Sequence, residues 1–416
     1  MSESAFHYRG EDLFVEDASL ASLADSLGTP LYVYSAKAIR ANLEAYEAAL
    51  ANYPHLVAYS VKAASNLAVL SLIQKAGGGA DIVSGGELFR ALKAGFDPRK
   101  IVFSGVGKSA QEMAEALKAG ILMFNVESAP ELMALSAVAK ELGLVAPVAF
   151  RVNPDVDPQT HPYIATGFRE SKFGAPMEES FELYLKAKAD PNLSVVGLDC
   201  HIGSQLTSAS PIKAAAERLA ALLGRLKAAG IELKCLDVGG GLGIDYKGEK
   251  PPTPLEWVAA FVPVLKEFSG LTLILEPGRS IVGPAGALVV RVLYDKATPY
   301  KRFVIVDGAM NDLIRPSLYG AHHAIKPVRD LKRPQAQVDV VGPVCESGDF
   351  LAQGRLMPLA EPGELLAVLG AGAYGFSMSS NYNSRPRAAE ALVEGSAFRV
   401  VRARETLEDL IRGETV

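Results

Sequence analysis

Between about residues 56 and 279, the chain alternates short apolar runs with longer amphipathic segments. Eight of these runs have the length and composition of buried strands, and polar or glycine residues follow each of them. The runs span 56–62, 80–84, 101–105, 122–126, 148–153, 195–201, 235–238 and 271–275. The intervening segments are rich in Ala, Leu, Glu and Lys, which favours helices, and they include 85–94, 110–119, 129–142 and 211–229.

Eight strand and helix units predict a (β/α)8 barrel of the TIM type, whose active site lies at the carboxyl ends of its strands. A doubly wound sheet would also alternate strands and helices. It would give no reason for polar residues after every strand, however, so the barrel is favoured.

After Gly286 the pattern changes to β-rich segments at 287–294, 303–306, 337–341, 365–369 and 398–402. The first 30 or so residues also contain strand-like runs that could pair with this region, and 405–412 predicts a short terminal helix. We therefore predict a barrel domain over residues 30–280. A β-domain, either a sandwich or a barrel, would be formed by 1–29 together with 281–416.

The charge and cysteine content narrow the choice of partners. The 416 residues carry a formal net charge of -5 without any basic tract, which disfavours a nucleic-acid groove or an anionic membrane as partner. The three cysteines form no C-x-x-C pair, which indicates a reducing compartment. No stretch approaches 18 apolar residues and the N-terminus lacks an apolar core, so we expect a cytoplasmic protein that acts on a small molecule.

Lys62 is the first candidate for chemistry, because it closes the apolar run Val57–Val61. Burying an ammonium group is costly, so a lysine in such a place tends to have a depressed pKa or to be held covalently as an imine.

Two neighbouring loops suit an anion. Asp237 precedes the run Gly239–Gly241 after the seventh strand, where glycines let backbone N–H groups approach a phosphate, although a tight turn would also use them. The eighth strand is followed by Glu276–Arg279, which adds a glycine and a guanidinium at the adjacent position. Together the two loops favour a phosphate site, as barrels commonly place one after strands seven and eight.

His201 ends the sixth strand. A single histidine beside apolar residues is more often part of the core, but its position puts it at the same end of the barrel as Lys62. There its flat ring could lie against an aromatic cofactor, and Ser204 could reach a phosphate. The six histidines show no metal-binding spacing, so we expect no metal.

Several other motifs cannot be assigned by spacing. Gly370–Gly375 satisfies G-x-G-x-x-G, but the residues after it do not predict the required helix, and Gly107–Ser109 lacks the first glycine of a P-loop. Cys345–Ser347 could be a small buried hydrophobe beside a solvated acid, and Arg315–Tyr319 could be a surface turn.

Taken together, the motifs resemble those of one known family. The chain resembles the diaminopimelate decarboxylase family, which is pyridoxal-phosphate-dependent and has an alanine-racemase-like barrel, over nearly its whole length. The matching stretches are Tyr59–Ala63, Asp81–Glu87, Ser171–Gly174, His201–Gln205, Gly239–Gly243, Glu276–Arg279, Arg315–Tyr319, Cys345–Ser347 and Gly372–Gly375.

The resemblance implies a role for each residue near the cofactor. Lys62 would hold pyridoxal phosphate covalently, and His201 would stack on the ring. Glu276 would pair with the pyridine nitrogen, and a carboxylate there keeps that nitrogen protonated so that the ring can accept electrons. The phosphate region would be lined by Ser204, Gly240, Gly241, Gly278, Arg279 and Tyr374.

The resemblance also implies a substrate, meso-diaminopimelate, and a product, L-lysine, formed in the last step of lysine biosynthesis. Arg279, Arg315 and Tyr319 would hold the distal carboxylate and Glu346 the distal ammonium, with Tyr374 nearby. Cys345 would supply the proton after CO2 leaves. In the family this cysteine reaches the neighbouring subunit, so we expect a homodimer with shared active sites, in which the β-domain contributes substrate-binding and dimer contacts.

Other readings stay open at this point. Racemases of the same fold typically place an arginine at the ring nitrogen, so Glu276 argues against them. A decarboxylase of another basic amino acid or of a carboxylated polyamine is a second possibility, and Arg315 speaks against the ornithine enzymes. A catalytically dead homologue is disfavoured because Lys62, Glu276 and Cys345 are all present. The residues leave the roles of Asp81, Arg151 and His161 undecided.

Overall fold

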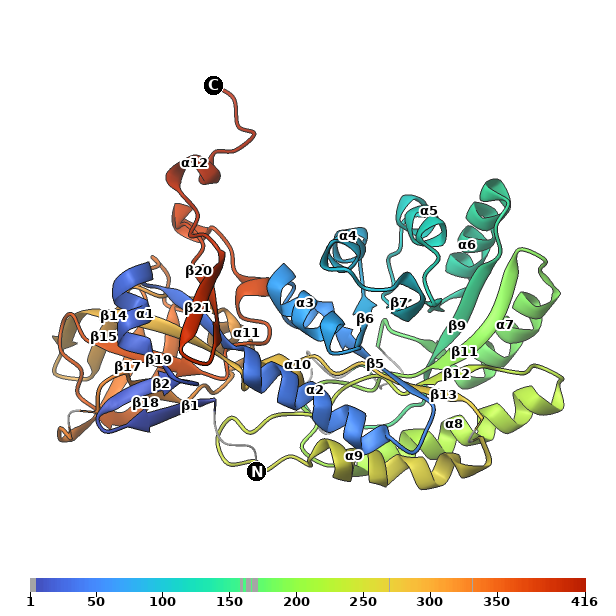
Figure 1. The fold of residues 1–416 in the computed structure, drawn as a ribbon, viewed down its shortest axis with the longest axis horizontal. Coiled ribbons are helices and arrows are strands. Elements are labelled where there is room, and N and C mark those ends of the chain that lie inside the picture. The colour runs from blue at the N-terminus through green and yellow to red at the C-terminus, as the bar shows by residue number, and fades with distance from the viewer. Residues whose placement is uncertain (1–4, 158–159, 162–165, 167–170, 269, 331) are drawn as a thin grey trace. The chain divides into compact units, whose positions relative to one another are not determined.

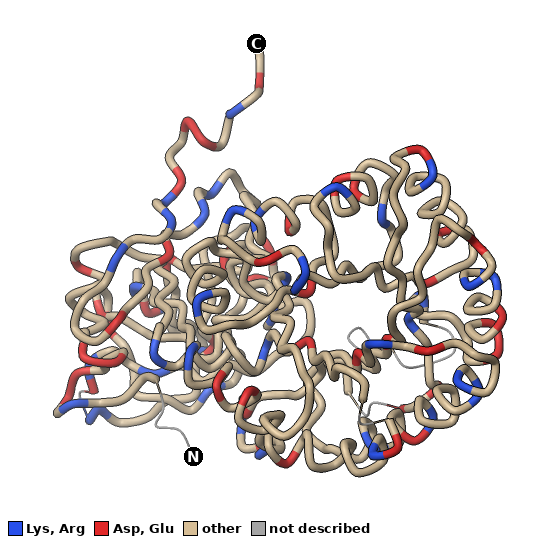
Figure 2. Tube along the Cα trace, turned by 45° about the vertical axis from the view of Figure 1, so that its right-hand side comes forward, with Lys and Arg blue, Asp and Glu red and all other residues tan. Residues whose placement is uncertain are grey.

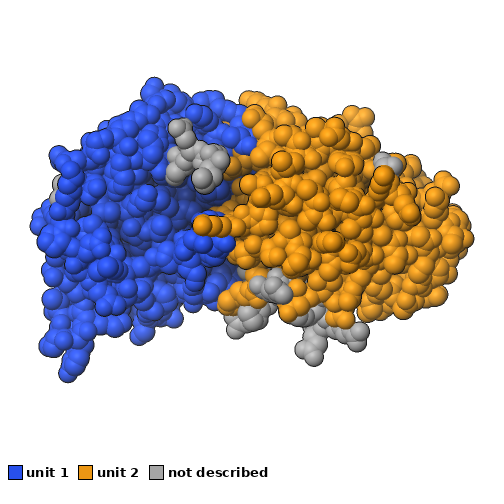
Figure 3. Space-filling view, turned by 90° about the horizontal axis from the view of Figure 1, so that it is seen from below, with its two compact units in different colours: residues 1–41, 245–249, 281–416 blue, residues 42–244, 250–280 orange. Residues whose placement is uncertain are grey.

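The computed structural model describes residues 5–157, 160–161, 166, 171–268, 270–330 and 332–416. It divides into two compact units, which Figure 3 colours separately. The barrel unit comprises residues 42–244 and 250–280, and the β unit comprises 1–41, 245–249 and 281–416.

The barrel unit is built on a closed ring of eight parallel strands, in which the sheet runs from β9 through β11, β12, β13, β5, β6 and β7 to β8 and back to β9. All eight predicted strands are confirmed, with ends that shift by only a few residues. Their bounds are β5 His55–Ser60, β6 Gly79–Ile82, β7 Ile101–Phe103, β8 Met123–Val126, β9 Ala146–Asn153, β11 Leu193–Asp199, β12 Cys235–Asp237 and β13 Thr272–Leu275. The short strand β10, Ala175–Pro176, pairs with β9.

Helices surround this ring (Figure 1). The predicted bounds of α4, α5 and α6 are confirmed, because a serine caps the start of each helix and a left-handed glycine follows its end. Along the chain the helices are α2 Ala36–Leu50, α3 Leu67–Lys75, α4 Gly85–Ala94, α5 Ala110–Ala119, α6 Ala129–Leu142, α7 Met177–Ala189, α8 Ser210–Ala228, α9 Pro254–Phe261 and α10 Arg279–Val282. Acidic and basic residues are interspersed along these outer helices (Figure 2).

The β unit contains the strands predicted after Gly286. Strand β4 (Leu31–Ser35) pairs with β14 and β20, which confirms that the N-terminal region joins this sheet. The sequence pattern missed β16, β18 and β20. The elements are β1 Phe6–Arg9, β2 Asp12–Val15, β3 Ala18–Ser19, α1 Leu20–Leu27, β14 Gly286–Ala297, β15 Arg302–Val306, α11 Arg315–Tyr319, β16 Ile325–Pro327, β17 Gln335–Val341, β18 Phe350–Pro358, β19 Leu365–Leu369, β20 Ala389–Glu394, β21 Ala397–Arg402 and α12 Leu407–Leu410.

Two local expectations are corrected. Lys62 lies just beyond β5, in the 3-10 turn Val61–Ala63, and not within the strand. The surface-turn reading of Arg315–Tyr319 is wrong, because these residues form α11 and Arg315 is buried. Within the described residues, no helix has both the length and the apolar character needed to cross a membrane.

Candidate active site

The side chain of Lys62 forms an ion pair at the carboxyl end of β5. Its Nζ lies 2.5 Å from Oδ2 of Asp81, which is fully buried on the neighbouring strand β6. The same carboxylate oxygen accepts a hydrogen bond from Ser60 Oγ at 2.8 Å. The lysine side chain itself is 36% exposed, so the amine is anchored by a buried acid while staying accessible.

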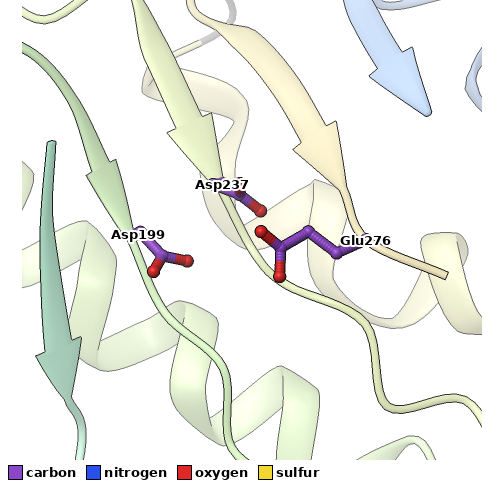
Figure 4. A group of neighbouring side chains, drawn as sticks. All are labelled: Asp199, Asp237 and Glu276. Atoms are coloured by element: carbon purple, nitrogen blue, oxygen red, sulfur yellow. The ribbon is translucent and has the colours of Figure 1, made fainter. Parts of the chain in front are cut away.

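Three buried carboxyl groups gather at the ends of the next strands around the ring (Figure 4). Asp199 ends β11, Asp237 ends β12 and Glu276 follows β13, and a set of their carboxyl oxygens lies within 4.8 Å. Within the described part of the chain, Asp199 Oδ1 and Asp237 Oδ2 have no hydrogen-bond partner. Buried acids this close do not all ionise readily, because each negative charge raises the cost of the next.

The electrostatics of the cluster follow from burial. Burial raises the pKa of Glu276 well above its usual range, and the charges of Asp81 and Asp199 add to the effect while Lys62 and Arg151 oppose it. Burial also raises the pKa of Asp237 well above its usual range, with Glu276 and Asp199 contributing. A cation placed beside Glu276 would offset this penalty and favour the carboxylate.

A short relay of hydrogen bonds orients Glu276. Ser104 Oγ donates to Glu276 Oε1 at 3.3 Å, and Asn125 Nδ2 donates to Ser104 Oγ at 3.0 Å. All three side chains are buried. The relay fixes one oxygen of the glutamate from the side of β7 and β8.

His201 is held as a neutral ring. The backbone N–H of Gly240 donates to its Nδ1 at 3.1 Å, so the ring proton belongs on Nε2. Burial, assisted by the positive charges of Arg151 and Lys62, holds the pKa of His201 well below its usual range. Arg151 in turn pairs with Glu127 at 3.2 Å, which assigns it a structural partner inside the barrel. A neutral imidazole is suited to stacking on an aromatic ring.

Five of the six residues predicted to bind phosphate belong to this unit, whereas Tyr374 belongs to the β unit. Arg279 Nη2 donates to Ser204 Oγ at 3.0 Å. A Cβ on Gly240 would lie 2.2 Å from the carbonyl oxygen of Glu276, and one on Gly278 would lie 2.9 Å from Ser60 Cβ. Gly241 has a φ of +109°, which also favours glycine. Side chains are therefore excluded from the backbone of both loops.

In the β unit, the predicted substrate residues lie on α11 and on the loop between β17 and β18. Ser317 Oγ of α11 donates to the carbonyl oxygen of Gly348 at 2.5 Å, which ties the two segments together. Tyr319 is the last residue of α11, whereas Cys345 and Glu346 are exposed on the loop.

Two backbone features of the β unit also concern predicted site residues. The N–H of Cys345 donates to Asn383 Oδ1 at 2.8 Å, which fixes the backbone of the loop at the thiol. Tyr374, in the glycine-rich turn after β19, has a φ of +55°, an unusual conformation for a residue other than glycine. Such backbone conformations concentrate at functional sites.

The sequence reasoning missed several residues of this site. Asp199 and Ser104 lie at strand ends, as the barrel rule requires, and a polar residue closing an apolar run is the signal that could have found them. Asp237 and Asn125 also lie there, but the sequence reasoning gave their side chains no role. Of the residues whose roles the sequence left undecided, Asp81 pairs with Lys62, Arg151 pairs with Glu127, and His161 is exposed.

The barrel residues fit pyridoxal phosphate. A serine, an arginine and side-chain-free glycine backbone converge where an anion needs donors. The buried Glu276 offers an acceptor to a protonated ring nitrogen, and the neutral His201 offers a flat surface. Lys62 supplies an accessible amine at the same end of the barrel.

Comparison with known proteins also indicates a pyridoxal-dependent enzyme. Residues 36–283 match the family model described as pyridoxal-dependent decarboxylase, pyridoxal binding domain. A diaminopimelate decarboxylase of Pseudomonas aeruginosa is 53% identical over 413 residues, which cover 99% of both chains.

Solved structures of diaminopimelate decarboxylases are also similar to this chain. A diaminopimelate decarboxylase of Helicobacter pylori complexed with L-lysine is 45% identical, with a TM-score of 0.92 and coverage of 94% of this chain and 98% of that one. One from M. jannaschii in co-complex with L-lysine is 38% identical, with a TM-score of 0.95 and coverage of 99% and 98%. The chain therefore belongs to the diaminopimelate decarboxylase family of pyridoxal-dependent decarboxylases.

Proposed function

We propose that the protein removes one carboxylate from meso-diaminopimelate, releasing CO2 and leaving L-lysine, with pyridoxal phosphate as its cofactor. The observation that carries this proposal is the gathering of Lys62, His201, Glu276 and the Ser204–Arg279 pair at one end of a barrel in a chain that matches these decarboxylases over its full length. The reaction would be the last step of lysine biosynthesis, in the cytoplasm.

Each barrel residue has a task that suits its surroundings. Bound pyridoxal phosphate supplies an electron sink for the electron pair left when CO2 departs. Lys62 would provide the amine that holds the cofactor, and Asp81 keeps that amine at the strand end. Glu276 would accept the N–H of the ring nitrogen, and Ser104 steadies its Oε1.

The phosphate end is held by donors. The guanidinium of Arg279, the hydroxyl of Ser204 and the backbone N–H groups of Gly240, Gly241 and Gly278 supply hydrogen bonds to an anion. We further propose that Tyr374, which belongs to the β unit, would add a hydroxyl to this set. His201, kept neutral, would offer its flat face to the ring without adding a second positive charge near Lys62.

The β unit supplies substrate recognition and the final proton. Arg315 and Tyr319, together with Arg279 of the barrel unit, would bind the distal carboxylate, Tyr374 would contribute to the same substrate site, and Glu346 would bind the distal ammonium. After the bond to the departing carboxylate breaks, the Cys345 thiol gives its proton to the α-carbon and a C–H bond forms. Cys345 is exposed in the single chain, which supports a homodimer in which it serves the partner's site.

The deciding experiment measures CO2 release and lysine formation by the protein loaded with pyridoxal phosphate, with meso-diaminopimelate and ornithine supplied in parallel. We expect release from meso-diaminopimelate alone, with lysine formed in equal amount. Release from ornithine instead would overturn the roles of Arg315 and Glu346 but keep the cofactor. Release from neither would overturn the proposal.

A further inference from the structure

Arg315 is held by two residues of the β unit to which the known chemistry gives no part. Its Nη1 donates to the hydroxyl oxygen of Tyr246 at 2.9 Å and to Nε2 of His323 at 2.9 Å. Both hydrogens of this nitrogen are thereby engaged. Arg315 is buried and His323 is fully buried, so these bonds form in an environment that shields them from water.

Tyr246 also stacks on the guanidinium. The Cζ atom of Arg315 lies 4.9 Å from the centre of the tyrosine ring, and the His323 ring meets that ring edge-on, with 5.3 Å between centres and an interplanar angle of 74°. One aromatic ring therefore holds the guanidinium by a cation–π contact, while its hydroxyl and the imidazole define the direction of one N–H pair.

The position of Tyr246 is itself fixed from several sides. Its backbone N–H donates to Glu249 Oε2 at 2.9 Å, and its carbonyl oxygen accepts from His322 Nδ1 at 2.9 Å. A Cβ on Gly370 would lie 3.2 Å from the tyrosine ring, so the ring packs closely on bare backbone. Residues 245–249 belong to the β unit although they follow β12 of the barrel in the chain.

His323 acts as an acceptor. Its Nδ1 lies 2.9 Å from the carbonyl oxygen of Leu369, which can only accept, so the ring proton is on Nδ1. Nε2 is then left with a lone pair, as the bond from Arg315 requires. The neutral imidazole is thus oriented by the end of β19, and it adds no positive charge beside the guanidinium.

We propose that Tyr246 and His323 are positioning residues that pre-orient Arg315 for the distal carboxylate of the substrate and thereby determine specificity. The proposal rests on the proposed function, which gives Arg315 that ligand. A free arginine side chain loses rotamer entropy when it is fixed. Here the stack and the two hydrogen bonds restrain it before the substrate arrives, so binding a carboxylate costs less.

This arrangement acts on a single group of the ligand. A pre-oriented guanidinium favours ligands with a carboxylate at the distal end, and it gives nothing to ligands that lack one. L-Lysine keeps the distal carboxylate of diaminopimelate, whereas cadaverine has lost it. The two amines therefore form a matched pair of probes for Arg315.

The test measures the binding of L-lysine and of cadaverine to the cofactor-loaded enzyme by calorimetry, together with kcat and KM for meso-diaminopimelate. Tyr246→Phe keeps the ring and removes the acceptor. We expect it to weaken L-lysine binding and raise KM roughly three- to tenfold, the net worth of one typical intramolecular hydrogen bond, with kcat and cadaverine binding nearly unchanged. Tyr246→Leu, which also removes the stack, should have a larger effect.

His323 provides an independent check. His323→Gln can accept from Arg315 and donate to Leu369, so it should bind L-lysine nearly as well as the wild type. His323→Leu can do neither and should lose affinity for L-lysine but not for cadaverine. Tyr300→Phe, at a side chain that is 93% exposed, is the matched control. Thermal unfolding of each variant identifies any loss of folding.

The outcomes separate this inference from the function on which it rests. If Arg315→Lys weakens L-lysine binding and Tyr246→Phe and His323→Leu do not, the positioning role is wrong and the function stands. If the Tyr246 variants weaken L-lysine and cadaverine equally, Tyr246 is structural and the inference is overturned. If Arg315→Lys itself leaves L-lysine binding unchanged, the role of Arg315 in the proposed function fails.

Discussion

The two groups of proposed site residues are built in different ways. In the barrel unit they lie at the ends of parallel strands of a closed ring, where Asp199, Asp237 and Glu276 are buried on three successive strands and Asp81 is buried on β6, beyond β5. In the β unit they lie on a five-residue helix and on a loop, and two of them, Cys345 and Glu346, are exposed.

This difference corresponds to a division of labour. Charge has to be controlled closely around an electron sink, and a rigid ring of strands can hold buried acids at fixed separations. Substrate recognition tolerates loops, provided that the important side chain is held in place by neighbours, as Arg315 is by Tyr246 and His323. The comparison therefore predicts that barrel substitutions disable all substrates, while β-unit substitutions alter selectivity or proton delivery.

The strongest test of the barrel group is Lys62→Ala. Removing the amine should lower decarboxylation of meso-diaminopimelate roughly thousandfold or more, because the covalent attachment is lost. In the wild type, borohydride reduction followed by peptide mapping should leave a pyridoxyl mark on the peptide containing Lys62. Lys93→Ala, on the exposed side of α4, should keep both the activity and the mark. A mark that persists elsewhere in Lys62→Ala with normal activity would contradict the assignment.

The strongest test of the β-unit group is Cys345→Ala, which removes the proposed proton donor. We expect a loss of activity of roughly a hundredfold, typical of removing a positioned acid. If Cys345 serves the partner's site, an equal mixture of Cys345→Ala and Lys62→Ala chains should recover about a quarter of wild-type activity after subunit exchange, because half of the dimers then carry one intact site. No recovery after demonstrated exchange would mean that each site is built from a single chain.

How far the sequence predicts the molecule also differs between the two units. The barrel was predictable because each strand is a short apolar run and each of α4, α5 and α6 has a serine cap and a terminal glycine. The rule that function follows strand ends then pointed to Lys62, His201 and Glu276. The resemblance supplied what the pattern could not, namely their individual roles.

The β unit was harder to predict because its site depends on contacts between segments far apart in the chain. Arg315 is oriented by Tyr246, which is 69 residues away in sequence, and no local pattern reports such a pairing. A five-residue helix such as α11 has too few turns to show a periodicity. In the barrel unit, Asp199 and Asp237 lie within strand-like runs, so the sequence pattern did not show that their buried carboxyl groups gather beside Glu276.

A smaller effect is expected from Asp199→Asn, which probes the buried charges of the barrel. Burial raises the pKa of Asp199 to about 7, with Glu127 and Asp81 adding to the shift and Arg151 opposing it. The folded protein therefore keeps a proton that the unfolded chain releases near pH 4, so stability falls as pH rises through this window. The variant has no titrating group at this position, and its urea midpoint should depend less on pH between about pH 4 and about pH 7.

The size of the Asp199 effect should be on the order of 1 kcal/mol or more across that range. Glu44→Gln, at an exposed position of α2, is the control and should follow the wild type. If the urea midpoint of Asp199→Asn changed with pH in parallel with that of the wild type, the Asp199 carboxyl group would not hold a proton in the folded protein. A protonated buried acid would then no longer distinguish the barrel group from the β-unit group.

The smallest effect is expected from Ser104→Ala, which removes the donor to Glu276 Oε1 and leaves Asn125 without that acceptor. At 3.3 Å the hydrogen bond is long, so we expect cofactor affinity to fall only roughly two- to fivefold, as measured by titrating pyridoxal phosphate into the cofactor-free protein. Ser208→Ala, at an exposed serine of the barrel unit, should bind the cofactor as the wild type does.

The pH dependence of this loss decides what the relay does. A hydroxyl donor stabilises the carboxylate, so its removal raises the pKa of Glu276 further and the acid form persists to a higher pH. The carboxylate accepts the N–H of a protonated ring nitrogen much more strongly than the neutral acid does, so the defect of Ser104→Ala should grow as the pH is lowered. A defect of equal size at every pH would mean that Ser104 only fills space, and control of the Glu276 charge would then rest on the neighbouring acids and cations alone.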